Sequence, residues 1–231
     1  MVTKGQSGAS ILILVAILAF PGFLFAQEQT PSPPPGGKRG AEAGDALVTF
    51  VWNGVQQAQK KYSSGCGAVT ETRTSQLLAK PLVLRGKFCG DGMTKFALEY
   101  FEPQPLRVRF NEDYLNVSTG PGARSTEVIQ VGRHVRRTQA FFSRDTSIGN
   151  LRQHFVITVR ESGPTYEMRL APRSERFKSR VHYVVVKLGK DDFLLRSLEV
   201  DGKNGVNSVF AIQINGLNLK LGEELFQVYK P

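Results

Sequence analysis

Residues able to do acid–base or metal chemistry are few in this chain and stand apart from one another. Its three histidines, His134, His154 and His182, form no pair at the short spacing typical of metal ligands. Asp191 and Asp192 adjoin in KLGKDDF between two apolar segments, where acidic neighbours indicate a turn rather than an acid–base pair. No G-x-S-x-G, P-loop or Rossmann glycine pattern occurs. The sequence therefore gives no indication of an enzyme.

Cys66 and Cys89 are the only two cysteines of the chain. An antiparallel hairpin that turns within SQLLAKP, residues 75–81, sets them opposite one another, at a separation that a disulfide can bridge with modest adjustment. We therefore predict a disulfide between Cys66 and Cys89. The same register places Glu71 opposite Leu84, a carboxylate beside an apolar side chain. Without nearby histidine partners, the two cysteines do not indicate a metal site.

The chain is basic, with 30 Lys and Arg residues against 20 Asp and Glu residues and a formal net charge of +10. Two clusters concentrate part of this charge. They are Arg133, His134, Arg136 and Arg137, and Arg173, Arg176, Lys178 and Arg180. Such clusters either form solvated surface or attract anionic headgroups and acidic partners. Nucleic acid is not indicated, because the aromatic side chains alternate away from the arginines.

Alternation of apolar and polar residues, punctuated by Gly, Pro, Asn and Asp, predicts half-buried antiparallel strands over most of the chain. The expected strands are CGAVTETRTS, LVLRGKFCG, TKFALEYFEP, LRVRF, EVIQVGRHVRR and FVITVRE, followed by a meander of strands from Tyr166 to Pro231. The apolar positions share one face of this sheet. They are Phe96, Leu98, Tyr100, Leu106, Val108, Phe110, Phe155, Ile157, Met168, Leu170, Tyr183, Phe210, Ile212 and Ile214. At this stage the face is equally compatible with an ordinary core and with the wall of a ligand cavity.

Two segments lack this alternation and are expected to be helical. Asp45–Tyr62 carries an apolar stripe at intervals of three and four residues, with Asp45 as the expected N-cap. Thr138–Arg152 predicts a shorter helix, capped at Asp145 or Thr146. The first helix is expected either to pack within the core or to lie as a cover over the apolar side of the sheet.

The first 44 residues are expected to lie outside the folded domain. Residues 1–26 have the apolar stretch of a signal peptide, with cleavage expected after Ala26, whereas Leu24 at the −3 position leaves uncleaved anchoring open. Residues 27–44 are rich in Pro and Gly and predict a disordered leader. Residues 45–231 are then a single domain, exported to the periplasm.

Several short motifs follow one another in a distinctive order. They are G-x-F at residues 86–88, KFALEYFEP, YEMRLAP, DDFLLRSLEVDG, VFAIQING and the closing LFQVYKP. In this order they resemble the LolA-type periplasmic carriers of outer-membrane lipoproteins. The resemblance covers residues 47–231 and rests on framework positions. It implies a mainly β fold, an unclosed antiparallel β-barrel (a half-barrel) with a helical lid over a hydrophobic cavity.

The resemblance also implies a function. Members of that family accept the acyl chains of lipoproteins from an inner-membrane ABC transporter and deliver them to an acceptor at the outer membrane. The apolar residues named above would form the cavity wall, and the two helical segments would form the lid. Neither ATP, nor a metal, nor another cofactor is implied for the carrier itself, which is expected to act as a monomer.

One position departs from the family. Typical members have an Arg-Pro pair in the strand before the aromatic segment, and that Arg helps to control opening. Gly92 and Met93 stand there in this chain, with Lys95 close by in sequence. The gating contact therefore cannot be carried over. Two alternatives stay open, namely a carrier of another lipid and an envelope sensor or interaction module on the same half-barrel fold.

Overall fold

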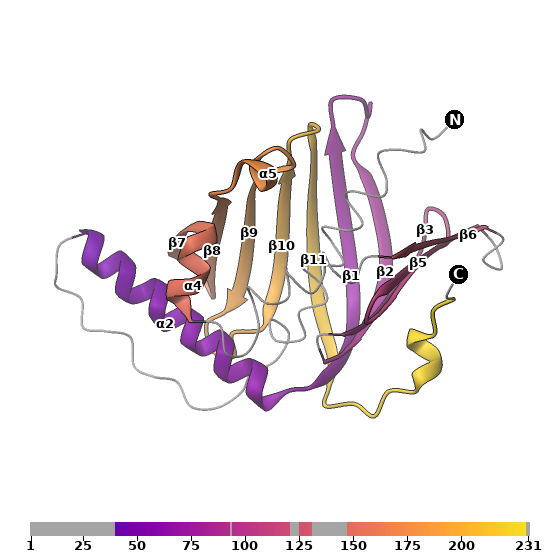
Figure 1. Cartoon of the computed structure of the whole chain (residues 1–231), viewed down its shortest axis with the longest axis horizontal. Coiled ribbons are helices and arrows are strands. Elements are labelled where there is room, and N and C mark those ends of the chain that lie inside the picture. Colours follow the sequence, from indigo (N-terminus) through magenta and orange to yellow (C-terminus); the bar gives the residue numbers. More distant parts are fainter. Residues whose placement is uncertain (1–39, 93, 121–124, 131–146, 230–231) are drawn as a thin grey trace.

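The computed structural model describes residues 40–92, 94–120, 125–130 and 147–229 (Figure 1). The predicted signal peptide and most of the predicted leader lie outside these residues. In chain order the elements are α2 (Gly40–Lys61), β1 (Ser64–Ser75), β2 (Leu82–Asp91), β3 (Lys95–Glu102), β4 (Leu106–Asn111), β5 (Tyr114–Thr119), β6 (Ser125–Gln130), α4 (Ile148–His154), β7 (Phe155–Ser162), β8 (Thr165–Pro172), α5 (Glu175–Lys178), β9 (Val181–Gly189), β10 (Leu195–Gly202), β11 (Val206–Leu217) and the 3-10 helix η3 (Glu223–Phe226).

The described strands form one eleven-stranded antiparallel sheet in the order β6-β5-β4-β3-β2-β1-β11-β10-β9-β8-β7. The chain builds it as two meanders, β1 to β6 and β7 to β11, which meet where β1 pairs with β11 in the middle. β6 and β7 lie at the two ends and do not pair with each other, so the sheet is not closed into a barrel. The half-barrel expected from the sequence is therefore confirmed.

The strand register sorts the side chains onto two faces. One row across β2 to β5 consists of Phe88, Leu98, Val108 and Val117. The neighbouring row consists of Lys87, Glu99, Arg107 and Ser118. Because successive residues of a strand point to opposite sides, the first row marks what we call the apolar face and the second row marks the polar face.

Helix α2 packs its apolar stripe into the core that the apolar face forms. Val51 and Trp52 are at most 1% exposed and belong to the same cluster of buried residues as the strands. The ring of Phe50 meets the ring of Tyr166 on β8 edge-on, and also that of Phe193, which follows β9. Figure 1 shows α2 crossing the β7–β10 half of the sheet before it leads into β1. The helix is thus both core and cover.

The start of α2 differs from the prediction. The helix begins at Gly40, so Asp45 lies within it and is not its N-cap. Ala41 and Ala43 are strong helix formers, which explains why the helix extends back through them. The Asp45 carboxylate instead forms an ion pair with Arg152 of α4, with 2.9 Å between Oδ1 and Nη2.

Helix α4 covers only the end of the segment predicted to be helical. It begins at Ile148, and the Ser147 hydroxyl caps it by accepting a hydrogen bond from the Asn150 amide. The expected caps, Asp145 and Thr146, lie outside the described residues, and so does the rest of the segment from residue 138. Serine is a favoured N-cap residue. Ser147 directly follows Thr146, one of the two predicted caps, so the prediction missed the described cap by one position.

Strand β5 was not predicted. It follows a turn in which Glu112 adopts a φ of 56°. Leu115 and Val117 then point to the apolar face, opposite Phe110 and Val108 of β4. β5 has only two apolar residues on this face, because its third position there is Thr119, and two are too few for a clear period of two.

The polar face carries the disulfide and the C-terminal segment. Cys66 and Cys89 lie directly opposite one another on β1 and β2, joined by a disulfide. Beyond β11 the chain crosses the polar side of β3 to β5. There Asn111 donates a hydrogen bond to the Phe226 carbonyl, and Asn116 exchanges two hydrogen bonds with the backbone of Tyr229.

Candidate functional site

All but one of the residues predicted to line the apolar face lie on it. The register places them in adjoining rows across the sheet, from Phe96 opposite Phe110 at one side to Leu170 opposite Ile157 at the other. Those confirmed on this face are Phe96, Leu98, Tyr100, Leu106, Val108, Phe110, Phe155, Ile157, Met168, Leu170, Phe210, Ile212 and Ile214. Most are buried, whereas Leu106, Ile157 and Ile214 are partly exposed.

Tyr183 is the exception, and its prediction was wrong. Val184 lies opposite Leu170 and so belongs to the apolar face, which puts Tyr183 on the polar face. There the Arg169 guanidinium lies 3.9 Å from the centre of its ring, and its hydroxyl contacts the Glu199 carboxylate. The run VHYVVV has apolar residues in both phases of the strand, so alternation alone could not choose between Tyr183 and Val184.

Further residues of the apolar face escaped the sequence prediction. Leu115 and Val117 were missed together with β5. Val186 and Leu188 of β9 were missed together with the phase of that strand, and they lie opposite Met168 and Tyr166. The pairing partners of a strand decide its phase, and single-strand periodicity does not reveal them.

A buried charged cluster lies on the described part of the apolar face, and the sequence prediction also missed it. Val69, Glu71 and Arg73 alternate along β1 on this face, with Glu71 between Leu84 of β2 and Phe210 of β11. The Glu71 side chain is 1% exposed and that of Arg73 is 23% exposed. A buried carboxylate in an apolar wall requires partners on both of its oxygens.

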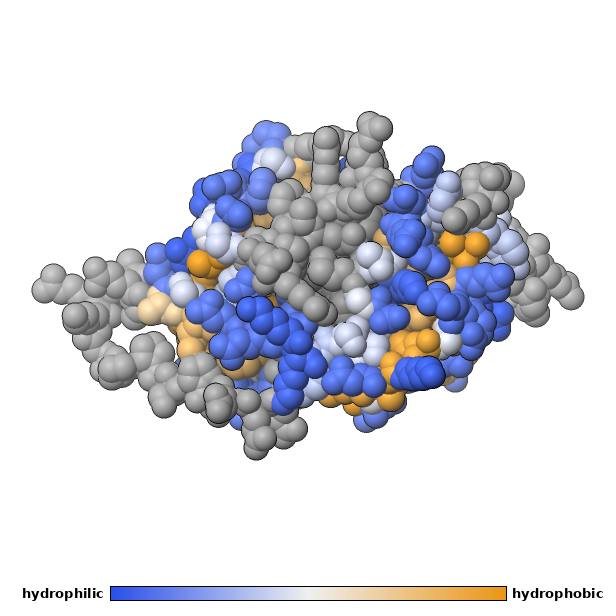
Figure 2. All heavy atoms as spheres, turned by 60° about the horizontal axis from the view of Figure 1, so that its bottom comes forward, coloured by the Kyte–Doolittle hydropathy of each residue, from blue (hydrophilic) through white to orange (hydrophobic). Residues whose placement is uncertain are grey.

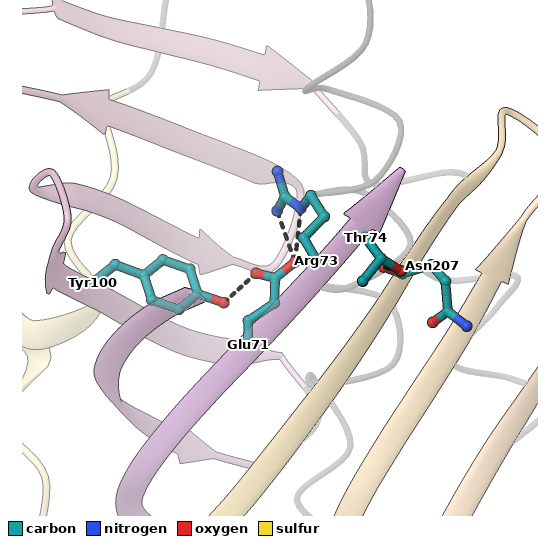
Figure 3. Close-up of polar contacts among 5 residues, drawn as sticks. All are labelled: Glu71, Arg73, Thr74, Tyr100 and Asn207. Atoms are coloured by element: carbon teal, nitrogen blue, oxygen red, sulfur yellow. Dashed lines mark hydrogen bonds and ion pairs between the residues drawn. The ribbon is translucent and has the colours of Figure 1, made fainter. Parts of the chain in front are cut away.

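Both partners are present in the structure. Arg73 donates two hydrogen bonds to Oε1 of Glu71, from Nε at 3.0 Å and from Nη2 at 2.7 Å. The Tyr100 hydroxyl of β3 donates to Oε2 at 2.7 Å. Figure 3 shows the two donors reaching the carboxylate from different sides, while Thr74 and Asn207 lie apart from this cluster. We call Glu71, Arg73 and Tyr100 the polar triad.

Burial and charge alter the acidity of the triad's phenol. Desolvation, followed by the Glu71 charge and the hydrogen bond to it, raises the pKa of Tyr100 far above its usual range. The phenol therefore stays protonated at physiological pH and keeps its donor for Glu71. Within the triad the positive charge of Arg73 and the negative charge of Glu71 compensate each other.

The predicted register of the hairpin gave a hint of this cluster. It placed Glu71 opposite Leu84, and the structure has that pairing. The carboxylate of Glu71 therefore does lie beside an apolar side chain. This unusual pairing pointed to the polar triad and was not an error in the predicted register. The signal in the sequence was Val69, Glu71 and Arg73 at intervals of two, with an acidic and a basic residue adjacent on the same face.

Other candidate residues of the sequence are spread over separate elements. Asp191 and Asp192 lie in the turn between β9 and β10, where Asp192 accepts a hydrogen bond from the Leu194 amide. His154 ends α4, whereas His182 belongs to β9. Among the described residues, no three His, Cys, Asp or Glu side chains are grouped so that they could hold a metal ion.

The two basic clusters differ in what the structure describes. Arg133, His134, Arg136 and Arg137 lie outside the described residues. In the second cluster, Arg173 donates from Nε to the carbonyls of Arg152 and Phe155, and Lys178 pairs with Glu175. Arg180 is exposed just before β9.

Gly92 and Met93, which stand where LolA-type carriers have an Arg-Pro pair, lie at the turn between β2 and β3. Gly92 has a φ of 58° in that turn, and Met93 lies outside the described residues. Lys95 is on the polar face, where it forms an ion pair with Glu223 of η3. It therefore does not point at the apolar face, and Arg73 is the basic residue that the described part of β1 places there.

The exposed apolar side chains of the described residues are spread over several segments. Figure 2 shows hydrophobic patches separated by hydrophilic residues on the face that is turned forward. The most exposed large apolar side chains, Leu77, Tyr229 and Phe101, belong to three different segments. No described helix is both long enough and apolar enough to cross a membrane.

No protein-family model and no curated protein matches the sequence. Among solved structures, the chain is similar to a LolA superfamily protein from Nitrosomonas europaea, at 11% identity over 78% of this chain and 97% of that chain, with a TM-score of 0.37. It is similar to the lipoprotein LppX of Mycobacterium tuberculosis at 11% identity over 77% and 98% of the two chains, with a TM-score of 0.44. A chain of the Pseudomonas aeruginosa MucA/MucB complex matches at 11% identity over 79% and 61%, with a TM-score of 0.48. All three similarities are distant, with TM-scores below 0.5.

Proposed function

We propose that this protein is a lipid carrier that holds acyl chains against the apolar face of its open sheet. The observation that carries the proposal is the width of this face relative to the described helix over it. Eleven strands at a spacing of about 4.8 Å extend for about 48 Å along the sheet. Helix α2, with 22 residues, is about 33 Å long and about 10 Å wide. It can cover only part of such a face.

Acyl chains fit the chemistry of this face. The face presents aliphatic and aromatic side chains from strand after strand, interrupted by the polar triad. Transfer of one methylene group from water to such a surface contributes about 0.8 kcal/mol. Ten methylenes would contribute about 8 kcal/mol before the cost of ordering the chain, which is ample for a carrier.

Loading requires an element over the face to move, because most residues of the face are buried in this structure. We propose that α2 is this lid. Its contact with α4 includes the ion pair between Asp45 and Arg152, whose side chains are 72% and 34% exposed. An exposed ion pair contributes about 0–1 kcal/mol, so it can break during opening at little cost. The second proposed lid segment, from Thr138, lies outside the described residues as far as Thr146.

The cellular role belongs to the same proposal. The signal-like residues 1–26 support export to the periplasm, and the LolA-like motifs support lipoproteins as cargo. In this scheme residues 45–231 act as a single, monomeric domain that receives acylated lipoproteins from an inner-membrane ABC transporter. It would then deliver them to an acceptor at the outer membrane. Another lipid as cargo would use the same face.

The test combines lipid identification with a matched pair of variants. Mass spectrometry of the gently purified full chain is expected to find bound lipid or lipopeptide. A fluorescent C16 fatty acid should bind the delipidated protein, and Ile157→Glu should weaken that binding at least tenfold. Val156→Glu is the control, because Val156 is the adjacent residue on β7, points to the polar face and is 47% exposed.

Two results would overturn the proposal. One is a chain that is always purified without lipid and binds no acyl probe. The other is an equal effect of both variants, which would indicate damage to the edge strand rather than loss of a binding surface. Recovery of a signalling protein in place of lipid would favour the sensor alternative.

A further inference from the structure

We infer that Arg73 is the headgroup site of the carrier: it binds a carboxylate or phosphate oxygen of an anionic acyl-chain ligand whose chain lies along the apolar face. The inference rests on the proposed function and makes it more specific, since it names the class of ligand. The Arg73 side chain is 23% exposed, against 1% for Glu71, so Arg73 is the member of this ion pair that retains access to solvent.

The position of Arg73 suits a ligand that is polar at one end. On β1 it is followed on the same face only by Ser75, the last residue of the strand. In the other direction, β1 continues along this face through Glu71 and Val69, flanked on β11 by Phe210 and Ile212. A headgroup at Arg73 would therefore lie near the end of the sheet, with apolar side chains leading away from it.

The hydrogen bonds of Arg73 leave donors free. A guanidinium has five N–H groups, and Glu71 accepts one from Nε and one from Nη2, both on the same oxygen. Among the described residues, no acceptor contacts Nη1. Its two N–H groups and the second N–H of Nη2 can reach the two oxygens of a carboxylate or phosphate, the geometry in which arginine binds such groups most strongly.

Glu71 and Tyr100 act as positioning residues in this arrangement. The carboxylate holds the Nε edge of Arg73, and the Tyr100 hydroxyl occupies the second oxygen of Glu71. Stability alone does not explain such a cluster, because well-packed apolar residues at the site of a buried ion pair are often as stabilising or more so. A fixed and partly exposed guanidinium edge is a reason to retain the charges.

Charges around this end of the sheet favour an anion. Three cations lie at the end of the sheet where β1 stops: Arg173 follows β8, Arg180 precedes β9 and Lys203 follows β10. None of them has a carboxylate partner among the described residues. The acidic side chains at this end include Asp201, Glu102, which pairs with Arg85, and Glu175, which pairs with Lys178. Other cations form ion pairs at both ends of the sheet, such as Lys178 with Glu175 and Arg85 with Glu102 at this end, and Lys190 with Glu161 and Arg196 with Asp192 at the opposite end.

The experiment compares ligands that share a chain and differ in the headgroup. Binding of hexadecanoate, hexadecyl phosphate and neutral hexadecanol to the delipidated full chain is measured by displacement of a fluorescent probe. We expect the two anions to bind about tenfold or more tightly than the alcohol. Preference for the carboxylate or for the phosphate identifies which of the two headgroups the cargo carries.

The variants are chosen to remove the site without leaving a buried charge. In the double variant Glu71→Gln/Arg73→Met, affinity for the anions should fall to that of hexadecanol, while affinity for hexadecanol stays within about twofold. Arg73→Lys keeps the charge and loses the fork of donors, so it should retain part of the preference. Arg107→Gln is the control, because Arg107 also pairs with a glutamate, Glu99, but on the polar face.

The outcomes separate this inference from the proposed function. Equal binding of all three ligands, unchanged in the double variant, would overturn the headgroup site and leave the carrier in place. Absence of binding for every ligand would overturn both. An equal loss for anions and alcohol in the double variant, with Arg73→Lys indistinguishable from the original chain, would assign the triad a structural role and reject the inference.

Discussion

The two faces of the sheet use the same pair of residue types in opposite ways. On the polar face Arg107 and Glu99 form an ion pair across β4 and β3, with side chains 46% and 32% exposed. On the apolar face Arg73 and Glu71 pair within β1, with side chains 23% and 1% exposed. The first pair adjoins another cation, Lys87 on β2, and belongs to a solvated row of charges. The second lies among hydrophobic residues, with Glu71 buried and Arg73 partly exposed.

The difference shows that environment, and not residue type, decides what an ion pair does. A solvated pair exchanges water for a partner at almost no net change in free energy. A buried pair must first lose its hydration, and it persists only if every lone pair is satisfied. Tyr100 completes this requirement for Glu71. Removal of single members should therefore have unequal effects on the two faces.

The largest effect is expected for Arg73→Gln. This change leaves the Glu71 carboxylate buried without its counter-charge, a condition that costs about 3–5 kcal/mol in fully enclosed pairs. Because Arg73 is partly exposed, we expect a loss of about 3 kcal/mol in the free energy of unfolding, measured by urea denaturation. The double variant with Glu71→Gln should recover most of it. A loss below about 1 kcal/mol would show that the triad is as solvated as the polar-face pair.

Removal of the disulfide should have a similar effect on the polar face. Cys66 and Cys89 close a loop with a sequence separation of 23 residues. The double variant Cys66→Ala/Cys89→Ala is expected to lose about 3 kcal/mol in the free energy of unfolding, mainly because the unfolded chain gains freedom. Thermal melts with and without a reducing agent check this, and the variant itself should no longer respond to the agent. An unchanged melt would mean that the neighbouring strand pairs already restrain this hairpin.

Tyr100→Phe should have an intermediate effect that depends on pH. Loss of the donor to Glu71 is expected to cost about 2 kcal/mol at neutral pH. The pKa of Tyr100 is raised in the folded state, so the stabilisation by its protonated phenol is fully present below the unfolded-state pKa of about 10 and decreases as pH rises above it. The stability difference between the original chain and Tyr100→Phe should therefore shrink above pH 10. A constant difference up to pH 12 would contradict the buried hydrogen bond.

The smallest effect is expected for Arg107→Gln. The pair with Glu99 is solvated, and Lys87 remains as a second partner of that carboxylate at 3.2 Å. The free energy of unfolding should change by at most about 1 kcal/mol, and 1 M salt should abolish the change. Urea denaturation at low and high salt measures it. A loss comparable to that of Arg73→Gln would remove the contrast between the two faces.

Most of the fold could be predicted because each long strand repeats its own alternation. Segments such as Phe96–Leu98–Tyr100 identify their inner face without any information on their neighbours. β5 failed this test because it has only two apolar residues on its inner face, and β9 failed because both of its faces are apolar at Tyr183 and Val184. In both cases the missing information lies in the partner strand.

The polar triad could not be predicted because it depends on the distance between strands. Glu71 and Arg73 are neighbours on β1, but Tyr100 joins them from β3, across β2. Tyr100 alone was expected to be a wall residue, and it is one, with its hydroxyl directed at Glu71. Alternation sorts residues by face, whereas a hydrogen bond between strands that do not pair depends on the curvature of the sheet.

The pairing of β1 with β11 has a consequence for how the chain is made. Each meander can form from neighbours in sequence as it leaves a ribosome or a translocation pore, but the middle of the sheet joins Ser75 to Val206 and Gly65 to Leu217. This seam can close only when nearly the whole chain has been delivered. Until then the edge of β1 that pairs with β11 has no hydrogen-bond partner, and Glu71 lies on this edge strand. A factor that shields this edge before the seam closes would act where the topology delays completion of the sheet.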